Sequence, residues 1–273
     1  MSSFDANRHR QGHASVNGLK MHYWVEGNGP PLVYIPPALG HAGMKSFPEL
    51  ARSHAVISID LQGHGRTADI AARALSLEQH AADIVELLRC LRISKADFLG
   101  ESFGGAVATI IALEHPALVR RVATYGATFG PAALAHNLDM LRFDQPPTAD
   151  SRGFRYQRAS YREVAPHPEH WSTLWNKVAS IRWEGFSDEQ LGSIEAPVLI
   201  AVGDQDFVRI EHAVASFRRI PNAELAVIPD ASHFLLFSEP ERLVPVVKHF
   251  LEKPEHRPPL ATAQMGYQPG ETR

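Results

Sequence analysis

The sequence predicts an α/β protein with a mostly parallel, doubly wound sheet of about eight strands and helices on both faces. Short, almost continuously apolar runs, such as residues 31–36 and 196–203, are typical of parallel strands that are buried on both sides. Helical patterns separate these runs along most of the chain. The length of 273 residues, with 44% hydrophobic and 21% charged residues, fits one α/β domain that carries an insertion.

The chain is predicted to begin with a β-hairpin, because Asn17 and Gly18 form a turn signal between two strand-like runs. Residues 76–93 have a strong amphipathic pattern, which predicts a helix. Ser76 is its expected N-cap, and Gln79, three residues later, completes the pattern of a capping box. The other predicted strands are residues 31–36, 54–60, 95–101, 119–126, 196–203 and 223–229. The other predicted helices are residues 103–115, 211–220 and 239–252.

The alternation is interrupted at residues 131–191, which are rich in aromatic and polar side chains. We expect a helical insertion there, either a connecting segment with a small core of its own or a lid over a site. The lid is favoured because ligands bind at the carboxyl ends of the strands in open α/β sheets. Residues 1–130 and 192–253 then form the core, and residues 254–273 form a flexible tail rich in proline and glycine.

The composition indicates which kind of partner the protein binds. A net charge of −3 provides no basic field for nucleic acid or an anionic membrane, so we expect a small-molecule partner. No stretch approaches the roughly 18 apolar residues of a membrane span, and the first residues lack a secretory pattern, which predicts a cytoplasmic protein. Cys90 is the single cysteine, so no internal disulfide forms, and its helical context predicts a core or boundary position. The oligomeric state stays open, with a homodimer as one option.

Residues 98–107, FLGESFGGAV, place Ser102 between Gly100 and Gly104. The alternatives are a glycine-rich bend and a tight turn that exposes a nucleophile. A strand-like run before the motif and a helical pattern after it favour the nucleophile. Because a serine hydroxyl is a weak nucleophile, it requires a base, a group that orients the base, and donors for the oxyanion.

Residues of the required types follow later in the chain. Asp204 and Asp206 come directly after the predicted strand at residues 196–203, and His233 follows the strand at residues 223–229. Ser102 and these residues each follow the carboxyl end of a predicted strand, in the order Ser, Asp, His. All three types are therefore expected at the same edge of the sheet. Either aspartate could orient the histidine on this reasoning alone.

Five motifs occur in order along the chain: YIPPALG at 34–40, DLQGHGRT at 60–67, GESFGG at 100–105, GDQDFV at 203–208 and DASHF at 230–234. Together they resemble the α/β-hydrolase fold family, in its serine esterase-like branch, up to about residue 252. The resemblance implies Ser102 as nucleophile and His233 as general base. It implies Asp206 as the acid, because the family places the acid three residues after a glycine, here Gly203, which leaves Asp204 as a turn residue.

The resemblance also implies two backbone donors for the oxyanion. One is the N–H of Phe103, the residue after the nucleophile, at a helix N-terminus. The other is the N–H of Ala38. Pro36 and Pro37 stand where the family more commonly has His-Gly, and neither proline has an N–H to donate.

Five apolar side chains are predicted to line a pocket for a small or medium acyl group, although each could be core packing instead: Leu39, Met44, Trp171, Trp175 and Phe234. Glu101 is interpreted as a buried structural residue. No metal site is predicted, because Pro168 interrupts the helix between His167 and His170 and no third ligand is expected near them. No cofactor is predicted.

A serine nucleophile predicts hydrolysis of carboxylic esters through an acyl-enzyme. It argues against the haloalkane dehalogenase and epoxide hydrolase branches, which place aspartate at this position. The same chemistry leaves a lactonase or thioesterase open. Three further classes stay open: a carbon–carbon bond hydrolase of ring-cleavage products, a peptidase or perhydrolase-like enzyme, and a catalytically silent ligand-binding member. The silent member should lack one of the three catalytic residues, and none is missing.

Overall fold

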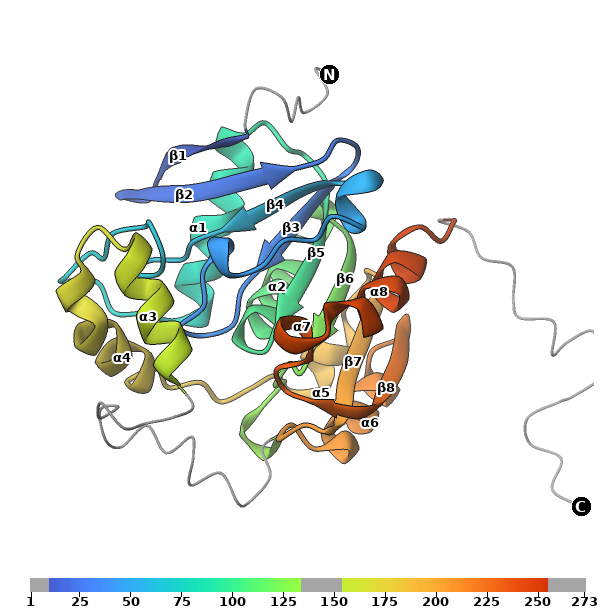
Figure 1. Cartoon of the computed structure of the whole chain (residues 1–273). Coiled ribbons are helices and arrows are strands. Elements are labelled where there is room, and N and C mark those ends of the chain that lie inside the picture. The colour runs from blue at the N-terminus through green and yellow to red at the C-terminus, as the bar shows by residue number, and fades with distance from the viewer. Residues whose placement is uncertain (1–9, 134–153, 255–273) are drawn as a thin grey trace, which may run out of the picture.

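The computed structural model describes residues 10–133 and 154–254. These residues form a central sheet with helices packed around it (Figure 1). The eight strands lie in the order β1-β2-β4-β3-β5-β6-β7-β8. The pairs β1–β2 and β2–β4 are antiparallel, and all later pairs are parallel. This confirms the predicted fold class. The strands are β1 (Gln11–Val16), β2 (Leu19–Glu26), β3 (Pro31–Ile35), β4 (Ala55–Ile59), β5 (Ala96–Glu101), β6 (Val119–Tyr125), β7 (Val198–Gln205) and β8 (Ala223–Ser232).

The first two strands form the predicted hairpin. Asn17 and Gly18 both have positive φ angles, 46° and 85°, as a tight two-residue hairpin turn of this kind requires. Asparagine and glycine adopt such angles at low cost, which is why this dipeptide marks the turn in the sequence.

Alternating strand residues build a core on each face of the sheet. On one face, Val33, Ile57 and Phe98 pack with residues of α1 (Leu77–Cys90), α2 (Phe103–Glu114) and α6 (Ile210–Arg219). On the other face, Leu32 and Leu99 pack with α7 (Leu235–Ser238) and α8 (Val244–Leu251). Figure 1 shows α1 and α2 behind the sheet and α8 in front of it. The parallel strands are apolar on both faces because both are covered.

Helix α1 differs from the prediction in two details. The Ser76 side chain accepts from the Gln79 N–H at 3.0 Å, as an N-cap should. The capping box is not completed, because the Gln79 amide instead donates to Asp83 at 3.0 Å. Asp83 also pairs with Arg73, so this buried carboxylate attracts the amide away from the helix end. Cys90 is exposed, which corrects the prediction of a core or boundary position.

Between β6 and β7 the described chain forms α3 (Arg155–Val164), α4 (Trp171–Ala179) and α5 (Asp188–Gly192). Helices α3 and α4 share a small aromatic core, here called the α3–α4 cluster, with residues of the sheet domain. Its buried members are Leu39, Leu75, Tyr161, Ala165, Trp171, Leu174, Trp175 and Val178. The predicted insertion therefore does contain helices. The rest of it, residues 134–153, and the predicted tail from residue 255 lie outside the described residues.

Two buried histidines, His80 of α1 and His64 of the 60–67 motif, lead to a prediction about stability. Burial lowers the pKa of His64 to about 4 and that of His80 to about 3. The unfolded chain takes up protons below about pH 6.5 whereas the folded protein does not, so stability present above pH 6.5 is lost as the pH falls toward 4. At pH 5 each histidine should account for about 2 kcal/mol of that loss.

Urea unfolding at pH 7.5 and pH 5.0 measures this effect. His80→Leu should reduce the loss of unfolding free energy between the two pH values by about 2 kcal/mol. The variant His249→Gln, on the exposed side of α8, should retain the wild-type loss. An unchanged loss in His80→Leu would show that His80 does not remain neutral in the fold.

Candidate active site

Ser102 stands on a strained turn between β5 and α2. Its φ and ψ angles are 53° and −118°, outside the regions that non-glycine residues normally adopt. A Cβ atom on Gly100 would collide with the Gly104 carbonyl oxygen, and one on Gly104 would collide with the Ile35 carbonyl oxygen. Both glycines are thus required for close backbone approach. Such strain costs about 1–3 kcal/mol and persists where the surroundings impose it.

His233 forms a hydrogen bond with one of the two candidate aspartates. Its Nδ1 lies 2.8 Å from Asp206 Oδ1, which also accepts from the Val208 N–H at 2.8 Å. Asp204 instead accepts from the Ala231 N–H at 3.2 Å. The structure therefore pairs Asp206, and not Asp204, with His233. Asp204 lies within β7, which corrects the expectation of a turn residue. The His233 ring also packs against Phe207, with their centroids 3.8 Å apart.

Gly126, at the end of β6, provides the space for this pair. A Cβ atom there would lie 2.7 Å from His233 Nδ1 and 3.0 Å from Asp206 Oδ2, and Gly126 has a φ of 57°. The Tyr125 hydroxyl donates to the carbonyl of Ser232, the residue before His233. Sequence reasoning missed Gly126, although its signal was present as a glycine at the end of the predicted strand at residues 119–126.

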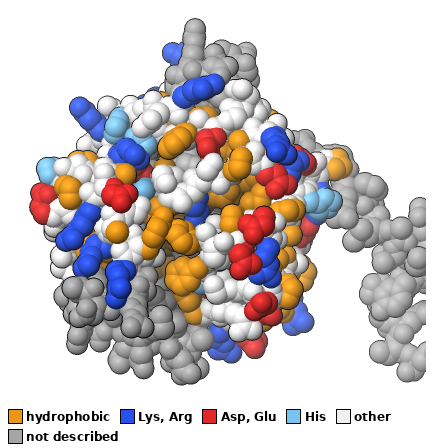
Figure 2. Space-filling view, in the orientation of Figure 1, with side chains coloured by type: hydrophobic (Ala, Val, Ile, Leu, Met, Phe, Trp, Pro, Cys, Tyr) orange, Lys and Arg blue, Asp and Glu red, His pale blue; other side chains and the backbone are white. Residues whose placement is uncertain are grey.

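One cavity of about 530 Å³ brings most of the predicted site together. Seven of the ten predicted residues line it: Ser102, His233, Ala38, Phe103, Leu39, Met44 and Phe234. Asp206 lies behind His233. Figure 2 shows hydrophobic side chains gathered between the α3–α4 and α7–α8 regions, and Tyr156, Phe234 and Phe237 are exposed cavity residues of these elements.

Two predicted pocket residues lie elsewhere. Trp171 and Trp175 are buried in the α3–α4 cluster and are not among the cavity residues. They point into the helical core because they lie on the apolar face of α4 with Leu174 and Val178. The aromatic side chains that do line the cavity include Phe154 and Trp183, which the sequence offered only as part of an aromatic segment.

The cavity also contains a buried ion pair that sequence reasoning did not find. Glu101 accepts from Lys45 Nζ and from the Tyr34 hydroxyl, the latter at 2.7 Å. Both charged side chains line the cavity and are almost fully buried. Burial lowers the pKa of Lys45, although Glu101 opposes the shift. Burial and the Glu101 charge raise the pKa of Tyr34 well above its usual value.

Asp60 secures the loop that follows β3. Its carboxylate accepts from the backbone N–H of Ala42 at 2.6 Å and of Arg66 at 2.9 Å, and it lies 2.9 Å from His22 Nδ1. Burial alone would raise the pKa of Asp60, but the hydrogen bonds from His22, Arg66 and Ala42 lower it overall. The 60–67 motif therefore ties the loop that contains Ala38 to the sheet.

His167 and His170 have a third possible donor beside them. Donor atoms of both histidines and of Glu169 all lie within 4.8 Å of one another, which corrects the expectation that no third ligand is near. The Glu169 carboxylate is 3.5 Å from His167 Nδ1 and 3.6 Å from His170 Nε2. All three side chains are exposed, and none lines the cavity.

This sheet order, with a serine on the turn after β5 and a histidine after β8, defines an α/β hydrolase. The chain belongs to the alpha/beta hydrolase family, whose model matches residues 24–246. The human serine hydrolase BPHL is 24% identical over 251 residues, 87% of this chain and 85% of the human protein. The 2-hydroxymuconate semialdehyde hydrolase of Pseudomonas sp. (strain CF600) is 31% identical over 140 residues, 50% of each chain.

Solved structures show the same fold. Est816, described as an N-acyl homoserine lactone degrading enzyme, superimposes with a TM-score of 0.70 at 26% identity and covers 87% of this chain and 99% of its own. CumD, a meta-cleavage product hydrolase from Pseudomonas fluorescens IP01, superimposes with a TM-score of 0.72 at 21% identity, covering 88% and 96%. Within residues 10–133 and 154–254, no helix is long and apolar enough to cross a membrane.

The two aspartates should respond differently to substitution. Asp206→Asn should lower kcat by about 10²- to 10⁴-fold, because an amide no longer stabilises the His233 imidazolium or fixes its tautomer. Asp204→Asn keeps an oxygen for the Ala231 N–H and should change kcat less than about threefold. Steady-state hydrolysis of p-nitrophenyl butyrate measures both, and the reverse ranking would reassign the acid.

Gly126→Ala should lower kcat by about tenfold or more, because the added methyl displaces His233 or Asp206 from their contact. Gly192→Ala is a matched control, since the nearest atom to a Cβ there is 3.9 Å away. The same p-nitrophenyl assay on both variants, with circular dichroism to verify folding, makes the comparison. Wild-type kcat in a folded Gly126→Ala protein would contradict this role.

Proposed function

We propose that the protein is a serine hydrolase that cleaves carboxylic esters of small to medium acyl groups through an acyl-enzyme. One observation carries the proposal. Ser102, on its strained turn, shares a cavity with His233, whose Nδ1 is held by Asp206. The other ring nitrogen, Nε2, is then available as a base for the serine.

In the proposed mechanism, His233 Nε2 takes the Ser102 hydroxyl proton while Ser102 Oγ attacks the ester carbonyl carbon. The Phe103 and Ala38 N–H groups donate to the resulting oxyanion. His233 then protonates the departing alkoxide, and an acyl-enzyme remains. A water molecule, deprotonated by His233, then attacks the acyl carbon. The bond to Ser102 Oγ breaks as His233 returns the proton to Oγ, and the acid is released. These steps require no cofactor or metal ion.

The loop geometry supports Ala38 as the second donor. The Gly40 N–H donates to the Pro37 carbonyl at 2.9 Å, and Leu39 has a φ of 65°, so residues 37–40 form a tight turn. This turn uses the Gly40 donor and lies beside the Ser102 turn, where the Ile35 carbonyl approaches Gly104. Ala38 and Leu39 both line the cavity.

The cavity supports the proposed substrate size and polarity. A volume of about 530 Å³ falls within the range of small-molecule sites, and most side chains that line it are apolar. Helices α3 and α4 contribute Tyr156, Gln157 and Val178 to the lining, which supports the interpretation of this insertion as a lid. The proposed partner is thus a small ester. A cytoplasmic location and a homodimer remain predictions.

Hydrolysis of a carbon–carbon bond in a ring-cleavage product is the second candidate. It is favoured by the 31% identity, over half of each chain, to a 2-hydroxymuconate semialdehyde hydrolase. Lactone hydrolysis is favoured by the likeness to Est816. A panel of esters, lactones, thioesters and 2-hydroxymuconate semialdehyde, assayed with wild type, ranks these activities by kcat/KM.

Ser102→Ala should abolish hydrolysis of p-nitrophenyl acetate and butyrate, because no other group can carry the acyl intermediate. Rapid acid quenching and mass spectrometry of the wild type should find a butyryl adduct on the peptide that contains Ser102. Ser193→Ala, an exposed serine at the end of α5, is the control and should retain wild-type rates. More than a few per cent of wild-type kcat in a folded Ser102→Ala protein would overturn the assignment.

A further inference from the structure

We propose that Lys45 and Glu101 form a subsite that binds a hydroxyl group on the acyl part of the substrate. The preferred substrates are then esters of hydroxy acids, or lactones whose acyl part carries a further free hydroxyl group. This inference rests on the proposed function, because it assigns the acyl group that Ser102 carries. The supporting observation is that Lys45 and Glu101, a buried pair of opposite charges, line a cavity whose other side chains are mostly apolar.

The pair lies next to the nucleophile in the chain and in the cavity. Glu101 is the last residue of β5 and directly precedes Ser102, and both line the cavity. Lys45 follows the short 3₁₀ helix at Ala42–Met44 and lines the same cavity. The side chains of Lys45 and Glu101 are only 7% and 4% exposed, so little water competes for their hydrogen bonds.

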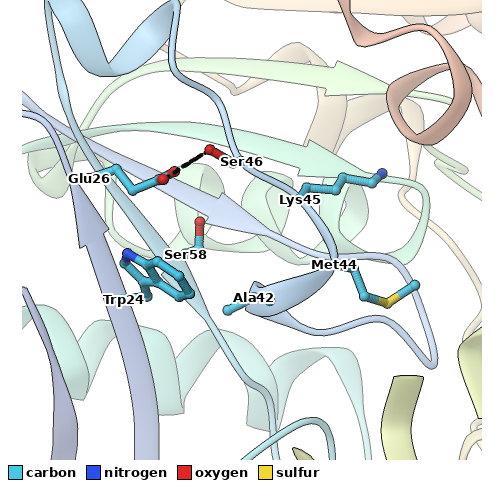
Figure 3. A pocket seen from close by; sticks show the side chains of 8 residues that line it. Trp24, Glu26, Ala42, Met44, Lys45, Ser46 and Ser58 are labelled. Atoms are coloured by element: carbon cyan, nitrogen blue, oxygen red, sulfur yellow. Dashed lines mark hydrogen bonds between the residues drawn. The ribbon is translucent and has the colours of Figure 1, made fainter. Parts of the chain in front are cut away.

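Lys45 lines two cavities. The second one, of about 280 Å³, is also lined by Trp24 and Glu26. Figure 3 shows the Lys45 side chain extending away from Trp24 and Glu26. Ser46 donates to the Glu26 carboxylate at 2.9 Å, so Glu26 already has a partner. The ammonium group is therefore directed to Glu101 and the larger cavity.

Both charged groups keep hydrogen-bonding capacity for a ligand. Glu101 uses Oε2 for both Lys45 and the Tyr34 hydroxyl, and its Oε1 has no bond among the described residues. The Lys45 ammonium has three N–H donors, of which this contact uses one. One acceptor and two donors thus remain on two side chains that line the cavity.

The charge balance selects the kind of group that binds there. A substrate carboxylate would be attracted by Lys45 and repelled by Glu101, so the two effects oppose each other. A hydroxyl group can donate to Glu101 and accept from Lys45 at once. An alkyl group can do neither, and would displace water from both charges without replacing its hydrogen bonds. The pair therefore favours a neutral hydroxyl.

Stability alone is a weak reason for this arrangement. Desolvation of a buried ion pair often cancels its attraction, so apolar residues of similar volume would serve a purely structural role as well or better. Hydrogen bonds to charged groups in a water-poor site are strong, and discriminate against ligands that leave the charges unpaired. Substrate selection is consistent with both facts.

The test compares p-nitrophenyl esters of butyrate, 2-hydroxybutyrate, 3-hydroxybutyrate and succinate. For the wild type, kcat/KM for at least one hydroxybutyrate ester should exceed that for butyrate by about tenfold or more. The succinate ester, which carries a carboxylate, should be the poorest of the four. No hydroxyl preference, or a preference for succinate, would overturn the inference.

The variants Glu101→Gln and Lys45→Met/Glu101→Gln test whether the pair causes the preference. The readout is the ratio of kcat/KM for the hydroxy ester to that for butyrate, which a merely structural role would not move. The ratio should fall several-fold in the single variant and to about one in the double variant. Lys248→Met/Glu252→Gln removes a solvent-accessible pair at the end of α8 that does not line the cavity, and it should keep the wild-type ratio.

A wild-type ratio in both folded site variants would contradict the subsite. The proposed function has a separate readout, namely hydrolysis of the butyrate ester by wild type and its loss in Ser102→Ala. Equal hydrolysis of butyrate and hydroxybutyrate esters would reject the subsite alone. Failure of wild type to hydrolyse any of the four esters would reject the proposed ester hydrolase together with it.

Discussion

The close approach of β5, α2 and the end of β3 is the constraint on which the site depends. Gly100 and Gly104 have no room for a Cβ atom, and a Cβ on Gly105 would lie 2.5 Å from that of Ala127. This packing forces Ser102 into its strained conformation. Helix α2 begins at the next residue. The helix N-terminus adds a favourable field for negative charge at the Phe103 amide. In the proposed mechanism, nucleophile exposure and oxyanion stabilisation are thus consequences of the same backbone contact.

The loops around the Ser102 turn are held in place by buried carboxylates that each accept several hydrogen bonds. Asp60 holds the loop after β3 through Ala42 N–H, Asp206 holds His233, and Glu101 holds Lys45. Loops are normally mobile, but catalysis needs positions accurate to within about 1 Å. Charge-assisted bonds to buried carboxylates supply that accuracy without a large apolar contact.

The motifs in the sequence were sufficient to predict the order of elements and the association of Ser102, Asp206 and His233, since the spacing within each motif is local. Asn17-Gly18 and Gly100–Gly104 report backbone conformations that few other residues tolerate. Sequence reasoning failed where the position of a side chain depends on which face of a helix or strand is buried. Composition suggests a pocket position for Trp171 and Trp175, but the apolar face of α4 turns them into the α3–α4 cluster. Gln79 fits a local capping pattern, yet a long-range carboxylate network around Asp83 determines its partner.

The Lys45–Glu101 pair shows why this limit matters for function. The two residues are 56 positions apart, and neither belongs to a pattern that local spacing can detect. In the sequence, Glu101 alone indicates a structural residue, which is the usual meaning of one buried carboxylate. Only the fold shows that it has a cationic neighbour, that both line the cavity, and that one acceptor and two donors remain on them. The reactive groups can therefore be inferred from motifs, whereas substrate selection depends on contacts that exist only after the chain has folded.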